Sequence, residues 1–192
     1  MGTHTQPQIH FKVPPATRLN IGSGGHSLRD WCNIDNDPAA CADLTLTVPP
    51  IPYDDDSIEE IYAGHFLEHL TQEDAGLFLD ECWRCLKPGG KLGIVVPDIR
   101  EVMQRYLSQQ PARVEYPIGN WRDCRDLDQI CDLFLYSTAQ DSHHQWNYDL
   151  LTLGRLLEAH KFTTIGEINR WLDPRVPVGA WYQFGLDSVK EG

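Results

Sequence analysis

The chain has 192 residues, of which 41% are hydrophobic and 23% are charged, a composition typical of one soluble globular domain. Its formal net charge of -12 argues against a nucleic-acid partner, because a phosphate-binding face needs Lys and Arg, and only 16 are spread along the chain. No apolar run approaches the roughly 20 residues that span a bilayer, and the N-terminus lacks a secretion signal, so we expect a cytoplasmic protein without a membrane span.

Three short strands are expected near the N-terminus, at residues 18–21, 32–35 and 43–48, after a polar lead-in over residues 1–17. The first strand ends in the turn Gly22-Ser23-Gly24-Gly25. Only ten residues separate the first two strands, whereas a crossover that includes a helix usually needs at least about ten to twelve. We therefore expect a helix of one or two turns at most here, and little room for one before the third strand.

The rest of the chain alternates helices and strands. The expected elements, in chain order, are a strand at 58–63, a helix at 71–86, a strand at 92–96, helices at 99–109, around 127–136 and at 147–160, and strands at 162–168 and 182–189. Residues 111–121 are turn-like. This alternation predicts an α/β fold with a mostly parallel sheet, formed by a single domain over residues 18–192.

The glycine turn and the acid after the second strand indicate a nucleoside site. Ligands of open α/β sheets bind beyond the carboxyl ends of the strands, and glycines let the backbone approach them closely. Asp35 ends the second strand, where its carboxylate can accept hydrogen bonds from two ribose hydroxyls. A dinucleotide-dependent dehydrogenase is the competing interpretation, but its G-x-G-x-x-G fingerprint would need a glycine at Ser27 and an acid about 20 residues on. Asp35 follows Gly22 by only 13 residues, which favours a single nucleoside.

Five segments follow one another in the order and spacing of a known family. They are Leu19-Asn20-Ile21-Gly22-Ser23-Gly24, residues 33–38, residues 52–62, Phe66-Leu67-Glu68-His69-Leu70 and residues 86–92. Together they resemble the motifs of class I S-adenosylmethionine-dependent methyltransferases and cover about residues 18–98. The sub-type looks like the compact methyltransferases often encoded beside sugar and cell-envelope biosynthesis genes.

This resemblance implies S-adenosyl-L-methionine as the cofactor. It also implies a Rossmann-like, mostly parallel seven-stranded sheet with its last strand antiparallel, here with shortened first helices. The glycines would pass beneath the amino-acid part of the cofactor, and the acid would hold its ribose. The expected cofactor-binding residues are Asn20, Gly22, Ser23, Gly24, Asp35, Asn36 and His65.

Two positions depart from the family pattern. Asn20 stands where the first motif often has an acidic residue, so it can form hydrogen bonds but carries no charge. Thr47 aligns with the Asp that commonly meets the adenine amino group, and Asp43 is nearby but out of register. The residue that contacts adenine is therefore not assigned.

The catalytic candidates follow from the reaction that the resemblance implies. Methyl transfer is an in-line displacement at a sulfonium, so alignment of the acceptor does much of the work. An alcohol acceptor also benefits from a base that removes its proton. The candidates are His65 after the fourth strand, Asp98 at the end of the fifth, and either His143 or His144 before the helix at 147–160.

Two motifs could bind metal, and we expect neither to do so. Residues 65–69 spell H-x-x-E-H, in which His65 and His69 on a helix would bind zinc with Glu68 as the base of a hydrolase. The motif directly follows a strand within a methyltransferase pattern, which favours structural contacts for Glu68 and His69 and no metal in the site. Cys82 and Cys85 form C-x-x-C inside an expected helix, which favours core packing.

The sequence as a whole favours methyl transfer to a hydroxyl of a sugar, glycolipid or small natural product. The alternative is a non-catalytic or regulatory S-adenosylmethionine-binding protein of the same fold, which Thr47 and the short first connections suggest. Those connections also predict a sheet face with little helical cover, whose apolar surface a second copy could bury. The pattern is thus compatible with a homodimer.

Overall fold

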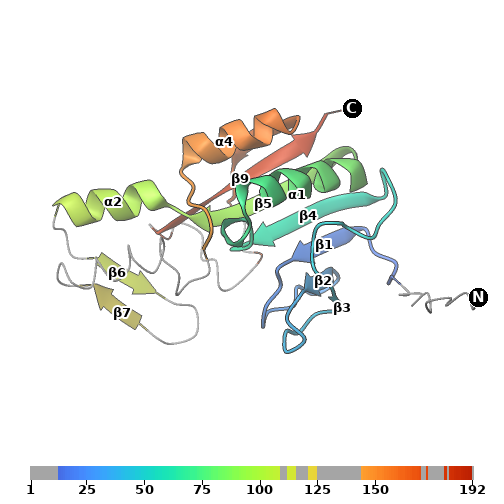
Figure 1. Cartoon of the computed structure of the whole chain (residues 1–192), viewed down its shortest axis with the longest axis horizontal. Helices are drawn as coiled ribbons and strands as arrows, with labels where there is room; N and C mark the ends of the chain where they lie inside the picture. The colour runs from blue at the N-terminus through green and yellow to red at the C-terminus, as the bar shows by residue number, and fades with distance from the viewer. Residues whose placement is uncertain are drawn as a thin grey trace, which may run out of the picture.

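The computed structural model describes residues 13–108, 144–169, 172, 180 and 182–191, and the backbone of strands at 112–115 and 121–124. Seven strands form one sheet in the order β3-β2-β1-β4-β5-β9-β8 (Figure 1). Five neighbouring strands, β3, β2, β1, β4 and β5, are parallel to one another, whereas β9 is antiparallel to both β5 and β8. The expected fold, with its last strand antiparallel, is confirmed. His143 and the helix expected around 127–136 lie outside the described residues.

The elements have these bounds. The strands of the main sheet are β1 (Arg18–Ile21), β2 (Cys32–Asp35), β3 (Leu44–Thr45), β4 (Ile58–Gly64), β5 (Leu86–Pro97), β8 (Phe162–Glu167) and β9 (Gln183–Lys190). The helices are η1 (Leu67–His69, 3-10), α1 (Gln72–Cys85), α2 (Ile99–Ser108) and α4 (Leu150–Ala159), and β6 (Ala112–Glu115) pairs with β7 (Trp121–Cys124) in a separate ribbon. Within the described part of the chain, no helix is long and apolar enough to cross a membrane.

Three elements differ from the sequence prediction. β3 has only two residues in place of the expected six, because the chain leaves the sheet before the proline run that starts at Pro49. β5 begins six residues earlier than expected, at Leu86, which pairs with Ile58 across an irregularity in register. The β6–β7 ribbon occupies part of the segment that was expected to be turn-like.

No helix lies in the first part of the described chain, before η1 begins at Leu67. Residues 13–66 are all described, and they form strands, turns and bends only. The predicted shortening of the first connections is therefore confirmed and goes further than expected. The ten-residue connection between β1 and β2 is held by the Asn33 side chain, whose Oδ1 accepts from Leu28 N at 2.7 Å. Its Nδ2 donates to Leu28 O and Trp31 O at 3.2 and 3.1 Å.

Helices α1 and α4 pack on one face of the sheet (Figure 1), which we call the helical face. Its core contains alternate strand residues together with buried side chains of both helices, namely Leu19, Ile21, Ile34, Ile61, Ala63, Leu92, Ile94, Phe78, Leu79, Cys82, Leu153 and Leu157. Cys82 and Cys85 are fully buried in α1, which confirms their predicted place in the core. Thr71 accepts from Asp74 N at 3.1 Å and caps α1 at its N-terminus.

The opposite face of the sheet carries the intervening residues, including Asn20, Asn33, Tyr62 and Val95. Tyr62 and Val95 are only 1% and 3% exposed, because they cluster with Leu28 and with partly buried side chains, namely Trp31, Ile168 and Leu172. The expected exposed apolar surface is therefore not found at these positions. Whether two copies associate stays a prediction.

Candidate functional site

The carboxyl ends of four neighbouring strands bring the predicted site residues to one edge of the sheet. The glycine turn follows β1, Asp35 ends β2, His65 follows β4, and Asp98 follows β5. These strands are adjacent and parallel in the order β2-β1-β4-β5, so their ends face the same way. We call this set the carboxyl edge. Open α/β sheets bind their ligands beyond the carboxyl ends of their strands, which is where these residues lie.

The glycine turn needs its glycines for conformation and for space. Gly22 and Gly24 have φ angles of 69° and 53°, a region that side chains disfavour. A Cβ at Gly22 would lie 2.8 Å from Phe66 Cδ2, so the turn packs directly on the residue that follows His65. Gly22 N and Ser23 N both donate to Ile34 O, at 2.9 and 3.1 Å. The turn is therefore fixed to β2 on one side and to the end of β4 on the other.

Asp35 is oriented by backbone amides on both of its carboxylate oxygens. Gly24 N donates to Oδ2 at 2.7 Å, and Asp37 N donates to Oδ1 at 2.9 Å. Each oxygen keeps a further lone pair, and the side chain is partly exposed, so it can still accept from two hydroxyls. Asn36, the next residue, is exposed. The Ser23 Oγ in the glycine turn is buried and has no hydrogen-bond partner among the described residues.

Asn20 is fully buried, and its amide explains why no acidic residue stands there. Its Nδ2 donates to Asn33 Oδ1 at 2.9 Å and thereby bridges β1 and β2 on the opposite face. An ionised carboxylate could not donate this hydrogen bond. Asn20 Oδ1 has no partner within the described part of the chain. Contact between Asn20 and a cofactor stays a prediction.

The two residues considered for the adenine contact have other environments. Thr47 is exposed beyond the end of β3. Asp43 Oδ2 accepts from both Asn33 N and Asn33 Nδ2, each at 2.8 Å, before β3 begins. Asp43 therefore lies at the amino end of β3, whereas the carboxyl edge is formed by the other ends of the strands.

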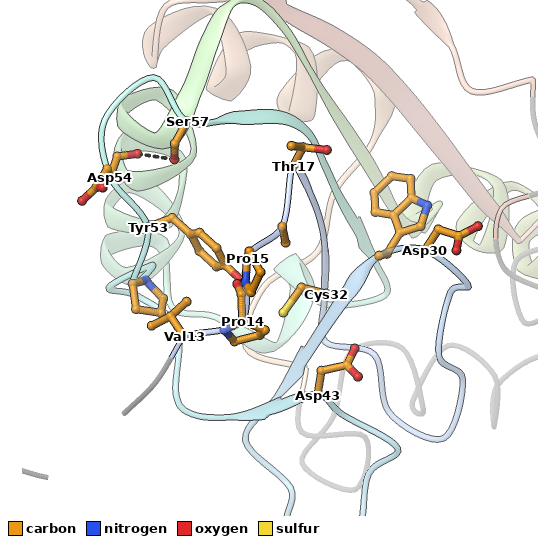
Figure 2. A pocket seen from close by; sticks show the side chains of 13 residues that line it. Val13, Pro14, Pro15, Thr17, Asp30, Cys32, Asp43, Tyr53, Asp54 and Ser57 are labelled. Carbon is orange, nitrogen blue, oxygen red and sulfur yellow. Dashed lines mark hydrogen bonds between the residues drawn. The ribbon is translucent and has the colours of Figure 1, made fainter. Parts of the chain in front are cut away.

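A hollow of about 1070 Å³, which was not predicted from the sequence, opens at the amino ends of the strands (Figure 2). The segment at 13–17 lies against it, and Tyr53 Oη donates to Pro14 O at 2.9 Å. Asp30, Asp43 and Asp54 supply its charged groups, and none of the described residues that line it is Lys or Arg. The hollow thus suits neither a phosphate nor the nucleoside site, which belongs to the other ends of these strands.

His65 is held in one orientation by both of its ring nitrogens. Nδ1 lies 2.9 Å from Glu68 Oε1, and Nε2 lies 2.9 Å from Gln183 Oε1 at the start of β9. The residue has a φ of 52° and precedes the single turn of η1. His65 and His69 therefore do not share a helix face, so the zinc-hydrolase arrangement of the H-x-x-E-H motif does not form.

Glu68 is a carboxylate with 1% exposure inside a group of aromatic and imidazole side chains. Burial raises the pKa of its carboxyl, but the hydrogen bond from His65 and the charges of His65 and His69 outweigh it, so the pKa lies below its ordinary value. Oε2 of Glu68 and the Tyr148 hydroxyl are both buried without a hydrogen-bond partner in the described residues. Burial, and then the charge of Glu68, raise the pKa of Tyr148 to about 12.

His144 joins this group from the segment before α4. Gln145 N and Trp146 N donate to Glu68 O at 2.8 and 3.2 Å, and Gln145 Nε2 donates to His69 O at 2.9 Å. The rings of His69 and His144 consequently meet edge to face, with centroids 4.8 Å apart. The two histidines belong to separate motifs 75 residues apart in the sequence, so their contact could not be predicted.

Asp98 ends β5 and begins α2. Its Oδ1 accepts from Glu101 N at 3.1 Å, and it pairs through an isolated bridge with Tyr148. Partial burial raises the pKa of its carboxyl, the amides of Glu101 and Arg100 lower it, and the negative charges of Glu101 and Asp149 raise it again. The net effect is a raised pKa, which makes Asp98 a better proton acceptor than an exposed aspartate.

Comparisons with known proteins agree with this geometry. Residues 22–94 match the family model described as a methyltransferase domain. No curated protein matches the sequence significantly. An S-adenosylmethionine-dependent methyltransferase structure from Thermotoga maritima has a TM-score of 0.56 at 12% identity, with coverage of 94% of this chain and 84% of that one.

Two further solved structures have the same fold. One is a methyltransferase from Aquifex aeolicus, with a TM-score of 0.51, 14% identity and coverage of 92% of this chain and 82% of that one. The other is the Burkholderia thailandensis 1,6-didemethyltoxoflavin-N1-methyltransferase with bound 1,6-didemethyltoxoflavin and S-adenosylhomocysteine. It has a TM-score of 0.53 and 14% identity, and the alignment covers 93% of this chain and 72% of that one.

Proposed function

Because the chain belongs to the class I S-adenosylmethionine-dependent methyltransferase superfamily and takes S-adenosylmethionine as its cofactor, we propose that it methylates a hydroxyl of a sugar, glycolipid or small natural product. The observation that carries the hydroxyl acceptor is the half-buried Asp98 carboxylate on the carboxyl edge. A hydroxyl must lose its proton during methylation, and a half-buried carboxylate with a raised pKa can accept it.

The residues of the carboxyl edge fit the cofactor. The turn at residues 22–24 would approach the amino-acid part of the cofactor without side-chain obstruction at its glycines, and Asp35 retains acceptor capacity for the ribose hydroxyls. The buried Ser23 hydroxyl without a partner marks a polar position that a ligand can satisfy. When bound, S-adenosylmethionine supplies a methyl group on positively charged sulfur, which makes that methyl an electrophile.

The side chains of the chain itself then have distinct tasks. Asp98 binds the acceptor hydroxyl and takes its proton at a carboxylate oxygen. Both ring nitrogens of His65 are engaged, so it acts as a positioning residue that joins the ends of β4 and β9. His144 lies where the segment before α4 meets η1, with its ring against that of His69. We therefore place proton removal on Asp98 rather than on either histidine.

Replacement of Asp98 by Asn tests this assignment. Asn keeps the N-cap hydrogen bond of α2 but cannot accept the proton. We expect kcat to fall about 10²- to 10³-fold, while binding of S-adenosylhomocysteine stays within about twofold. Transfer of labelled methyl to a panel of hydroxylated acceptors measures the rate, and Glu101→Gln serves as a neighbouring control. Unchanged kcat in Asp98→Asn would place the base elsewhere. Cofactor binding without turnover on any acceptor would support the non-catalytic alternative.

The pH dependence of the rate gives a second readout of the same group. Only ionised Asp98 accepts a proton, so kcat decreases as the pH falls through its raised pKa. The acid limb should therefore lie above the ordinary aspartate value of 3.8. The negative charges of Glu101 on α2 and Asp149 before α4 both act on Asp98 and raise its pKa. Because Glu101 raises this pKa by its charge, Glu101→Gln should move the limb to lower pH.

A further inference from the structure

Three potential metal ligands meet beside the carboxyl edge although the sequence places them far apart. One ligand atom each from Glu68, His69 and His144 lies within 4.8 Å of the other two. An ion bonded at about 2.1 Å holds tetrahedral ligand atoms about 3.4 Å apart, so the ligand atoms need to approach one another by up to about 1.4 Å. Two of them lie on η1, and the third lies on a segment that three hydrogen bonds attach to η1.

The buried carboxylate is an independent sign of a cation. A carboxylate removed from water is costly unless both oxygens find donors or positive charge. Glu68 Oε1 is satisfied by His65, whereas Oε2 has no hydrogen-bond partner among the residues that the structure describes. The partnerless Tyr148 hydroxyl lies in the same buried surroundings. A cation bound by Oε2 and the two imidazoles would satisfy the carboxylate.

The donor set selects a class of ion. Two imidazole nitrogens and one carboxylate oxygen suit divalent transition metals, while Mg²⁺ and Ca²⁺ prefer oxygen ligands throughout. Three protein ligands also leave a coordination position open, as in catalytic rather than structural sites. We propose that Glu68, His69 and His144 bind one divalent transition-metal ion of the Zn²⁺ type. This replaces the expectation from the sequence that the site holds no metal, and it uses a different residue set from the H-x-x-E-H motif.

The proposal does not depend on the acceptor or on methyl transfer, so binding of the metal alone tests it. Chelator-treated and dialysed full-length chain is titrated with ZnCl₂ in a calorimeter, and CoCl₂ is added in parallel while its visible absorption is recorded. We expect one Zn²⁺ per chain, and visible absorption bands typical of Co²⁺ with four or five ligands. His69→Ala and His144→Ala should each weaken binding at least about tenfold, by analogy with the loss of groups that support metal ligands.

Two control measurements keep the outcome clear. His160→Ala removes a surface histidine whose Nδ1 lies 2.8 Å from Asp80 Oδ1, and it should bind Zn²⁺ like the wild type. Glu68→Gln should also lose Zn²⁺, and its circular dichroism must match the wild type. If Glu68→Gln does not fold, His144→Ala tests the proposal instead, because His144 is partly exposed. Absence of Zn²⁺ binding, binding that survives both histidine variants, or a site that takes Mg²⁺ in preference to Zn²⁺ would overturn the proposal.

Discussion

The two faces of the sheet are built from the same strands but are stabilised in different ways. Helices α1 and α4 cover the helical face (Figure 1), and apolar side chains of β1, β2, β4 and β5 pack against them. On the opposite face, β1 and β2 present Asn20 and Asn33, whose amides bond to each other. Asn33 also bonds to the backbone of the connection between these strands. Side-chain hydrogen bonds thus stabilise the connection between β1 and β2, which contains no crossover helix.

Among substitutions on the two faces, Phe78→Ala on the helical face should reduce the free energy of unfolding most. Phe78 is fully buried on α1 and meets the Phe66 ring edge to face at 5.1 Å. Truncation of a buried Phe leaves a cavity, so we expect a loss of about 3–5 kcal/mol in the free energy of unfolding. Urea denaturation followed by circular dichroism measures it. A loss below about 1 kcal/mol would mean that α1 contributes little to the core.

Asn33→Ala should have the next largest effect. The substitution removes the partners of Leu28 N, Leu28 O and Trp31 O on the opposite face. We expect a loss of about 2–3 kcal/mol, because buried backbone groups are left without hydrogen bonds. Amide exchange at Leu28 should also become faster, since this connection has no helix of its own. Asn36→Ala is the matched control, and its exposed side chain should change stability by less than about 0.5 kcal/mol. Equal effects of the two substitutions would contradict the role given to Asn33.

The smallest effect should come from Leu77→Gln on the outer surface of α1. Leu77 is 51% exposed, so its replacement should change the free energy of unfolding by no more than about 0.5 kcal/mol.

Most exposed large apolar side chains of the described chain lie on α1, α2 and around α4. If two copies associate, light scattering should show that substitutions on these helices, and not at Tyr62, disrupt the dimer. A dimer that dissociates only on Tyr62 substitution would reverse this view of the two faces.

Local signals in the sequence predicted much of the fold. The bounds of β1 and β2 agree with the prediction, because the glycine turn and Asp35 end these strands unambiguously. The β6–β7 ribbon was not predicted, because residues 111–121 carry turn signals and no alternation. β5 was predicted too short because Gly89 and Gly90 are typical of a turn, while pairing with β4 extends the strand through them.

Less of the site could be predicted, because its geometry depends on contacts between distant segments. The sequence indicated the residues of the carboxyl edge, since each one directly follows a strand. It could not indicate that His65 is held at both nitrogens, because Gln183 lies 118 positions away. The meeting of His69 with His144 likewise depends on hydrogen bonds between η1 and the segment before α4.

We infer that residues 13–66, which contain no helix, contribute the glycine turn, Asp35 and His65 to a nucleoside site on the carboxyl edge. Calorimetric titration with S-adenosylhomocysteine tests it most directly, in the wild type, in Asp35→Ala and in the control Asp37→Ala. Asp37 supplies only its backbone N–H to Asp35, which the control retains. We predict one ligand per chain, with affinity about 10- to 100-fold weaker in Asp35→Ala and unchanged in Asp37→Ala. Absence of binding to the wild type, or equal affinity in all three proteins, would contradict the account.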